Sequence, residues 1–295
     1  MATSSKGPNL APPMTPWNQV TIIGTGLIGG SLGLALKQAG AAGRVVGVGH
    51  RRSTLDLAID RGAVDAGTLD PAEGVAGSDL VVLATAVGLF EPVVRDVAGA
   101  LAPGAVVVDV GSTKARVVRA LEPLMPAGCA FVGCHPIAGS EKRGIAHADA
   151  GLFRGATCVV TPTDATPAAA VDRVAATWQA VGMTVLRMTP EDHDRLVAES
   201  SHLPHVAAAA LVRALGEGAE PLVGTGWTDT TRIASGDPVV WRDILATNAD
   251  AVAGAIARYQ EGLEAFRQAL VAGNAEAVQR LLAEAQRRRD GVVGA

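Results

Sequence analysis

The chain has 295 residues, of which 48% are hydrophobic and 18% are charged, and its formal net charge is −4. This length favours two domains over one, and the acidic balance provides no basic surface for nucleic acid. No apolar run approaches the roughly 18 residues that a membrane-spanning helix needs. We therefore expect neither a nucleic-acid nor a membrane partner.

Residues 1–17 are rich in proline, serine and threonine, and they lack the apolar core and cleavage site of a secretory signal. We expect them to form a disordered tail. The three cysteines, Cys129, Cys134 and Cys158, are odd in number and form no CxxC pair, which argues against a disulfide framework. A reducing cytoplasm is therefore the expected location.

Residues 20–49 contain a β-branched run, a glycine-rich turn, an apolar segment with helical spacing and a second β-rich run. This order predicts a βαβ unit. Its turn has the GxGxxG spacing, in which two glycines let the backbone approach a pyrophosphate and a third lets the helix pack closely on the strand. Because the motif follows a strand and opens a helix, it indicates a dinucleotide site. The expected cofactor contacts in this turn are Gly24, Gly26, Leu27, Ile28 and Gly29.

The end of the second strand bears on the choice of cofactor. NAD enzymes usually carry an acidic residue there, whereas an arginine accommodates the 2′-phosphate of NADP. Here Gly49 stands about where the acid would be, and His50, Arg51 and Arg52 follow it. We expect NADP to be favoured over NAD, although the same residues could be solvated surface charges.

Further β-rich runs alternate with helical stretches up to residue 188. This alternation predicts an α/β domain over residues 18–188, with a mostly parallel, doubly wound Rossmann-type sheet. Ligands of such sheets bind at the carboxyl ends of the strands, where Thr85, Ser112 and His135 are expected. The runs cover residues 79–85, 104–112, 130–136, 156–162 and 183–188.

His135, in the stretch GCHPIAGSEKRG, has three possible roles: a catalytic base, a metal ligand or a structural residue at the end of a strand. Imidazole is the side chain best suited to proton transfer near neutral pH. A metal site is disfavoured because the chain has no HExxH or Cys/His ligand spacing. Cys134 would point to the opposite face of an extended segment. The residues alone leave the catalytic and the structural role open.

Residues 189–295 show a helical pattern, interrupted by Pro204, which should bend its helix. A later segment carries apolar residues with alternating spacings of four and three, which indicates a continuous apolar seam. The seam could be ordinary core, but a helix this long often shares its face with a partner helix, so we expect a homodimer. Asn274 is the expected N-cap of the last helix. The seam consists of Val252, Ile256, Tyr259, Leu263, Phe266 and Leu270.

Several longer motifs occur in one order along the chain: GTGLIGGSLGLALK, DVGSTK, GCHPIAGSEKRGI, HDRLVAESSHLPHVAAAAL and TRIASGDPVVWRDI. Together they resemble the prephenate/arogenate dehydrogenase family of tyrosine biosynthesis, over residues 20–270. The last three motifs are not shared with dinucleotide-binding proteins at large. The resemblance implies a nucleotide-binding sheet followed by an all-helical domain for substrate binding and dimerisation.

The resemblance also implies a reaction. The family oxidises prephenate or arogenate with NAD(P): a hydride leaves ring C4, the 4-hydroxyl loses its proton, and carbon dioxide departs as the ring becomes aromatic. By motif, His135 would accept the hydroxyl proton and Ser112 would hydrogen-bond beside it. We expect Lys114 and Lys142 to be structural or surface charges.

The substrate-binding residues are implied in the same way. The resemblance places His202 and His205 by the substrate, makes Arg232 an anchor for its side-chain carboxylate, and puts Glu141 near the mouth of the site. Guanidinium suits two-point recognition of a carboxylate. The two histidines could instead be half-buried structural residues, and Arg232 could pair with Asp229 or Asp237.

Two other classes fit the same two-part plan: another dehydrogenase, of the 3-hydroxyacid dehydrogenase or imine reductase type, and a cofactor-binding sensor without catalysis. Such dehydrogenases typically centre their chemistry on a lysine or aspartate of the helical domain, whereas the candidates here are His135, Ser112 and Arg232. Ala86 stands where the family often has proline, so we expect a more flexible turn there. The sequence does not choose between prephenate and arogenate.

Overall fold

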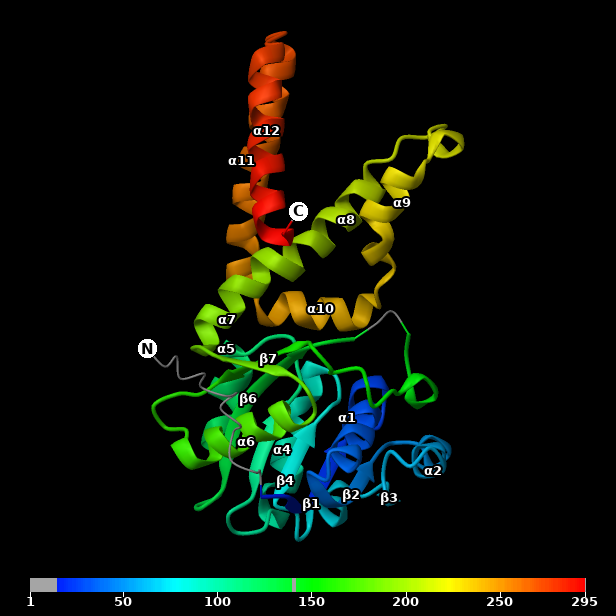
Figure 1. Ribbon diagram of the computed structural model, residues 1–295, viewed down its shortest axis with the longest axis vertical. Coiled ribbons are helices and arrows are strands. Elements are labelled where there is room, and N and C mark those ends of the chain that lie inside the picture. Colours follow the sequence, from blue (N-terminus) through cyan, green and yellow to red (C-terminus); the bar gives the residue numbers. More distant parts are fainter. Residues whose placement is uncertain (1–14, 140–141, 295) are drawn as a thin grey trace, which may run out of the picture. The chain divides into compact units, whose positions relative to one another are not determined.

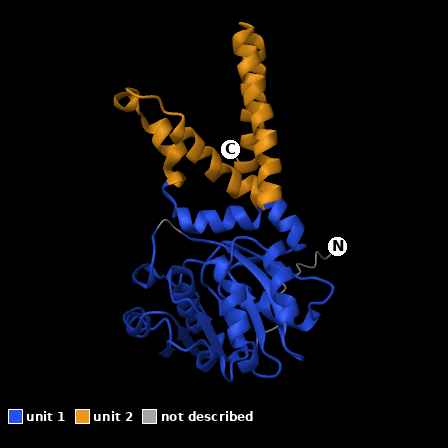
Figure 2. Ribbon diagram, turned by 180° about the vertical axis from the view of Figure 1, so that it is seen from behind, with its two compact units in different colours: residues 1–196, 235–248 blue, residues 197–234, 249–295 orange. Residues whose placement is uncertain are grey.

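The computed structural model describes residues 15–139 and 142–294. The chain forms two compact units (Figure 2). The first consists of residues 1–196 and 235–248, and the second of residues 197–234 and 249–295. Glu141 and most of the expected tail lie outside the described residues.

The first unit contains an eight-stranded sheet in the order β3-β2-β1-β4-β5-β6-β7-β8 (Figure 1). Neighbouring strands are parallel, except that β7 runs antiparallel to β6. The chain order reverses between β1 and β4, which makes the switch point where such sheets bind ligands. The strands are β1 (Trp17–Ile23), β2 (Ala42–Val48), β3 (Ala66–Thr68), β4 (Leu80–Leu83), β5 (Val106–Asp109), β6 (Ala130–Ile137), β7 (Thr157–Thr161) and β8 (Thr184–Arg187).

Helices cover both faces of this sheet because its central strands are apolar on both sides. In β4, Leu80 and Val82 pack into one apolar cluster, which α1 and α6 complete. Val81 and Leu83 point the other way, into a cluster that α4 and α5 complete. The helices of this unit are α1 (Leu27–Gln38), α2 (Arg52–Asp60), α3 (Pro71–Val75), α4 (Phe90–Val97), α5 (Ala115–Leu121), α6 (Ala168–Ala180), α7 (Pro190–Val197, the last residue of which falls in the second unit) and α10 (Pro238–Thr247).

The predicted fold class, a doubly wound Rossmann-type sheet followed by helices, is confirmed, but the position of His135 needs a correction. The residue lies inside β6 and not at the end of a strand. The reason is that β6 is longer than its pairing with β5. That pairing ends at Val132, and from Gly133 to Ile137 the strand pairs with the antiparallel β7. His135 therefore sits on the part of β6 that extends past the carboxyl end of β5.

Trp17 does not belong to the tail, as the sequence suggested, but begins β1 and is fully buried. Its backbone pairs with Ala42 of β2. The indole nitrogen donates a 2.9 Å hydrogen bond to Thr177, and the guanidinium of Arg173 lies 3.4 Å from the ring centroid. These contacts attach the start of the chain's first strand to α6.

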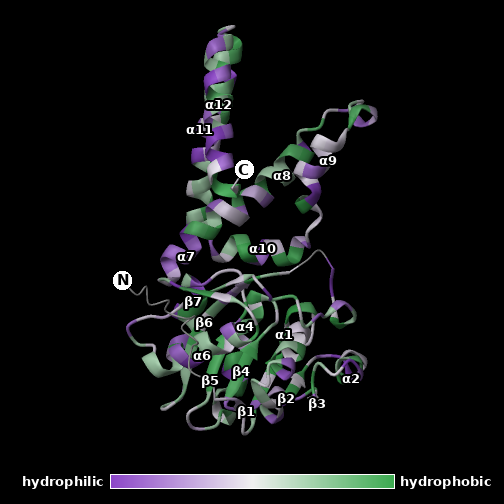
Figure 3. Ribbon diagram, in the orientation of Figure 1, coloured by the Kyte–Doolittle hydropathy of each residue, from purple (hydrophilic) through white to green (hydrophobic). Residues whose placement is uncertain are grey.

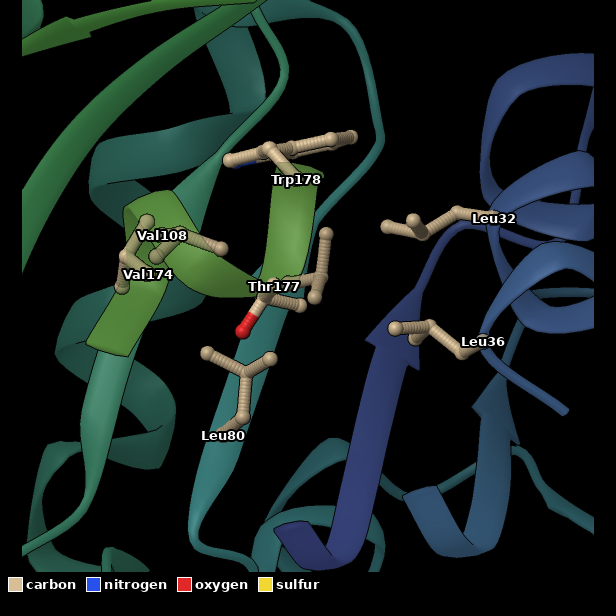
Figure 4. A pocket seen from close by; sticks show the side chains of 8 residues that line it. Leu32, Leu36, Leu80, Val108, Val174, Thr177 and Trp178 are labelled. Carbon is tan, nitrogen blue, oxygen red and sulfur yellow. The ribbon is translucent and has the colours of Figure 1, made fainter. Parts of the chain in front are cut away.

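A small cavity lies in the apolar core between α1, α6 and the strands (Figure 4). It holds about 10 Å³, which is about the least space that one water molecule needs. Leucine and valine side chains dominate its lining, so the space is a packing gap and too small for a cofactor or a substrate. The lining residues are Leu32, Leu36, Leu80, Val82, Val108, Val174, Thr177 and Trp178.

The second unit is helical. A π-helical segment, Ala198–His202, connects α7 to the helix that begins at Leu203, and Pro204 lies in the first turn of that helix, where a missing N–H is tolerated. Asn274 caps the last helix, as expected, by accepting a 2.9 Å hydrogen bond from the backbone of Ala277. The helices are α8 (Leu203–Arg213), α9 (Thr225–Thr231), α11 (Ala249–Val271) and α12 (Ala275–Val293).

The apolar seam of α11 is only partly covered. Val252 is buried, whereas 43% of Tyr259, 52% of Leu263 and 65% of Leu270 are exposed. Figure 3 shows α11 and α12 with hydrophobic and hydrophilic residues interspersed along their lengths. Within the described residues, no helix is long and apolar enough to cross a membrane.

Candidate active site

The glycine-rich turn between β1 and α1 forms a cradle of backbone. Gly24 has φ +105°, and a Cβ there would lie 2.6 Å from the carbonyl oxygen of Ala84. A Cβ on Gly29 would lie 2.0 Å from the carbonyl oxygen of Gly24, whereas a Cβ on Gly26 would meet nothing within 4 Å. The turn therefore packs tightly on the protein at Gly24 and Gly29, but it leaves space for a ligand beside Gly26, where α1 begins. This arrangement fits a pyrophosphate at the helix N-terminus.

Two further predicted residues follow the carboxyl ends of β4 and β5. Thr85 follows β4 closely and is half-buried, and Ser112 follows β5 and is also half-buried. The contact between Gly24 and Ala84 shows that the loop after β4 lies against the glycine-rich turn. Thr85 therefore lies beside the glycine-rich turn, at the edge of the sheet where such folds bind ligands.

The three residues predicted to recognise a 2′-phosphate follow β2. His50, Arg51 and Arg52 are all exposed. Arg51 is the N-cap of α2, and Arg52 donates a 3.2 Å hydrogen bond to the carbonyl oxygen of Gly67 in β3. No acidic side chain stands at Gly49, where a Cβ would come within 3.2 Å of Leu55. The end of β2 therefore presents exposed cationic side chains.

His135 is the first member of a row of hydrogen-bonded side chains. Its Nδ1 lies 2.8 Å from Nε2 of His193, and Nδ1 of His193 lies 2.8 Å from Oδ1 of Asp194. The two imidazole rings meet edge to face, with centroids 5.0 Å apart and an interplanar angle of 73°. His135 is half-buried, whereas only 1% of His193 is exposed. The row thus runs from the partly open His135 into the protein.

Asp194 connects these hydrogen-bonded side chains to the N-terminus of α5. Its carboxylate accepts hydrogen bonds from the backbone N–H groups of Lys114, at 2.7 Å, and Ala115, at 2.9 Å. The carbonyl oxygen of Asp194 accepts a third, at 2.7 Å, from the side-chain amide of Asn248, which follows α10. A carboxylate at a helix N-terminus is stabilised by the free N–H groups and the helix dipole.

A buried ion pair fixes the ends of β5 and β6. Lys114 and Asp109 are fully buried and pair with each other. Asp109 also accepts hydrogen bonds from the backbone N–H groups of Gly111, at 2.9 Å, and Cys134, at 3.0 Å. These bonds hold the segment that carries Ser112 beside the segment that carries His135. Lys114 is therefore structural and not a surface charge.

Cys134 faces the core, as its alternation with His135 predicts. The side chain is fully buried in the apolar cluster that contains α1 and α6. Burial also raises the pKa of the neighbouring Cys158 thiol. Both thiols therefore belong to the interior, whereas His135 is half-buried.

The other predicted substrate-binding residues belong to the second unit. His202 ends the π-helical segment and His205 follows in α8; both are buried, and burial lowers the pKa of His205. Arg232 follows α9 and is exposed. Asp237, a possible partner for it, instead forms an ion pair with Arg143 at 2.5 Å.

Sequence reasoning missed His193 and Asp194. Both stand at the start of the motif HDRLVAESSHLPHVAAAAL, from which only His202 and His205 were predicted to be site residues. The available signal was a histidine and an aspartate beside each other among otherwise solvated charges. Within the described residues, no group of three or more His, Cys, Asp or Glu side chains is arranged to hold a metal ion.

Comparison with known families identifies the origin of this arrangement. Residues 32–187 match the nucleotide-binding domain of prephenate dehydrogenase, and residues 189–284 match the dimerisation domain of the same family. The chain belongs to the prephenate dehydrogenase family. Membership confirms the resemblance drawn from the motifs, and it makes the protein a nicotinamide-dependent dehydrogenase.

Individual relatives agree with this family. Prephenate dehydrogenase of Bacillus subtilis is 32% identical, over 92% of this chain and 76% of its own length. The crystal structure of prephenate dehydrogenase from Aquifex aeolicus, in complex with hydroxyphenyl propionate and NAD+, has a TM-score of 0.87 at 33% identity and covers 93% of this chain and 98% of its own. Synechocystis arogenate dehydrogenase has a TM-score of 0.81 at 29% identity, with 93% and 100% covered.

Proposed function

We propose that this protein catalyses the oxidative decarboxylation of prephenate, to 4-hydroxyphenylpyruvate, or of arogenate, to tyrosine. The observation that carries the proposal is the position of His135. It is a half-buried imidazole, held by His193, on the part of β6 that extends past the carboxyl end of β5 in a nucleotide-binding sheet. Family membership supplies the reaction class, and the relatives include both prephenate and arogenate dehydrogenases.

His135 acts on the substrate's ring hydroxyl. When bound, the nicotinamide accepts the hydride that leaves ring C4. His135 takes the proton of the 4-hydroxyl as that carbon becomes a carbonyl, because an alcohol can release a hydride readily only if its proton leaves as well. The bond from C1 to the carboxylate then breaks, carbon dioxide departs, and the electron pair enters the ring. The carbonyl oxygen gains a proton, and the product is a phenol.

The remaining candidate residues bind and orient the substrate. Ser112 hydrogen-bonds near the reacting hydroxyl, and His202 and His205 contact the substrate. Arg232 anchors the side-chain carboxylate, not the carboxylate that leaves, because a cation there would hold back the electrons that must enter the ring. Glu141, which the family resemblance assigns to the mouth of the site, lies outside the described residues.

NADP is the proposed preferred cofactor. The support is the exposed cationic group at the end of β2, together with Gly49 where an NAD-specific acid would stand. Dissociation constants for NAD and NADP decide the point: NADP should bind more tightly, and tighter binding of NAD would refute the preference.

The second half of the chain, from residue 189, is proposed to bind substrate and to form a homodimer. The dimerisation-domain match and the exposed residues of the α11 seam support this proposal. A cytoplasmic location is also proposed, supported by three cysteines that are all free thiols.

The direct test is the absorbance of the reduced cofactor, followed for all four pairs of substrate and cofactor. We expect a rise with prephenate, arogenate or both, and steady-state kinetics over the four pairs then assign the substrate. If neither substrate reduces either cofactor, the proposal is refuted, and the protein is another dehydrogenase or a sensor.

A further inference from the structure

Two buried residues that the proposed reaction does not use lie directly behind His135. The exposed fraction of His193 is 1% and that of Asp194 is 4%, and both come from α7. Burying polar groups is costly unless they are hydrogen-bonded. Here both nitrogens of His193 are used, one towards Asp194 and one towards His135. The ring of His193 is therefore a bridge between a carboxylate and the proposed base.

The direction of each hydrogen bond follows from the chemistry of Asp194. Its carboxylate receives the backbone N–H groups of Lys114 and Ala115, which can only donate. An aspartate that accepts from such donors acts as a carboxylate, which has no proton to give. The third partner, Nδ1 of His193, must then donate, so this nitrogen carries the ring proton.

The protonation of His193 in turn fixes that of His135. A neutral imidazole carries one proton, so Nε2 of His193 holds a lone pair and accepts. Nδ1 of His135, 2.8 Å away, must therefore be the donor. The lone pair of neutral His135 then resides on Nε2, the nitrogen that can accept a proton from a substrate.

We propose that His193 and Asp194 are positioning residues, which orient the ring of His135 and fix the tautomer that leaves Nε2 as the accepting nitrogen. This inference rests on the proposed function, because it assigns a task to His135. The ionised Asp194 also stabilises, through His193, the positive charge that His135 gains when it takes the hydroxyl proton.

The neighbouring charges do not supply the same effect. Lys114 and Asp109, which lie beside the row, pair with each other, so their charges largely cancel. Asp194 is an acidic group that is connected to His135 through His193. Replacing His193 should remove the hydrogen bond that orients His135 and should lower the rate of proton transfer to it. The same replacement should leave the Lys114–Asp109 ion pair and the glycine-rich turn in place.

The test compares His193→Leu with His193→Gln. Leucine removes the acceptor, whereas the glutamine side chain can place an oxygen near the former Nε2. We expect His193→Leu to lower kcat by roughly 100-fold, within the range for a mispositioned general base. His193→Gln should recover about 10-fold of that loss, consistent with the usual effect of an orienting hydrogen bond. KM and the dissociation constant of the cofactor should change little.

The pH profile separates positioning from mere stability. Without the link to Asp194, protonated His135 is less favoured, so the acidic limb of kcat/KM should move to lower pH in both variants. Asp192→Asn is the matched control, because Asp192 lies on the same helix and is exposed, with its hydrogen bonds to Thr189 and Arg195 outside the row. It should leave kcat and the profile unchanged.

Asp194→Asn is the second variant, and it guards against failure of the leucine variant to fold. An amide N–H that faces Nδ1 of His193 would move the proton of that ring to Nε2, which would reverse the direction of the hydrogen bond to His135. We therefore expect kcat to fall. The melting temperature reports any loss of stability from the changed hydrogen bonds of residue 194 to the N-terminus of α5. A lowered melting temperature with unchanged kcat and pH profile in all these variants would overturn the inference. A wild-type protein that reduces no cofactor would instead refute the proposed function.

Discussion

The two compact units use their apolar side chains in different ways. In the first unit, β4 and β5 are buried along their whole length, and their side chains fill two clusters that the same chain closes. In the second unit, α12, which is described in full, has no buried residue, and α11 buries only Val252, Ala255 and Ala269. One unit completes its core by itself, whereas the other leaves apolar side chains available to a partner.

The same contrast applies to charged groups. In the first unit, Lys114, Asp109 and Asp194 are buried and held by specific partners around the site. In the second, a pair such as Arg258 and Glu199 lies in solvent. Buried groups of the first kind should be costly to change, while exposed ones should matter little for stability.

Lys114→Ala should have the largest effect on stability. It leaves Asp109 as an uncompensated buried charge, which typically costs about 3–5 kcal/mol. Urea denaturation measures this loss. The control is Arg95→Ala, which removes an exposed pair with Glu91 and should cost under about 1 kcal/mol. Similar losses for the two variants would contradict the assignment of Lys114 to a buried pair.

Leu263→Glu should separate the proposed dimer without unfolding either unit. A charge on the seam of α11 would have to be buried against the partner helix, whereas in a monomer it stays in solvent. Light scattering should give the mass of a monomer for this variant and of a dimer for the wild type. Leu69→Glu, at an exposed leucine of the first unit, is the control and should remain dimeric. A monomeric wild type would contradict the homodimer.

The pH dependence of stability should reveal the buried His205. Burial lowers its pKa below the ordinary value of 6.5, so the unfolded chain takes up a proton before the folded one does. The contribution of neutral His205 to the free energy of unfolding is therefore fully present above about pH 6.5, the pKa in the unfolded chain. It is lost as the pH falls towards and through the lower pKa of His205 in the folded protein. His205→Gln should flatten this part of the curve of melting temperature against pH. An unchanged curve for His205→Gln would contradict its burial.

Ala86→Pro should have the smallest effect, and a favourable one. The φ of Ala86 is −61°, which lies in the range that proline imposes. Restricting the unfolded chain at a compatible site stabilises a protein by about 0.4–1 kcal/mol. Urea denaturation checks the sign, and a destabilised variant would show that the turn does not accept proline.

Local patterns in the sequence predicted most of the first unit. The glycine spacing and the β-branched runs are periodic or contiguous, so the turn at Gly24 and the central strands could be located without tertiary information. The antiparallel direction of β7 was not predicted, because strand direction depends on which neighbour a strand meets. Trp17 was assigned to the tail because its partners, Thr177 and Arg173, lie far along the chain.

The candidate site was predicted only in part for a similar reason. His135, Ser112 and His193 all stand in the motifs that carry the resemblance, but the role of His193 depends on a hydrogen bond to a residue 58 positions away. A histidine in a charged helical turn has no local feature that distinguishes it from a solvated one. The fold supplies that information by placing α7 beside His135 in β6 and beside the N-terminus of α5.

The most direct measurement compares the wild type with His135→Asn in the formation of reduced cofactor, with prephenate and with arogenate. We expect the wild type to reduce NADP or NAD with at least one substrate. His135→Asn should bind the cofactor equally well and turn over roughly 10²- to 10⁴-fold more slowly, as expected on losing a general base. Turnover by His135→Asn at the wild-type rate would contradict the role of His135 at the centre of this site.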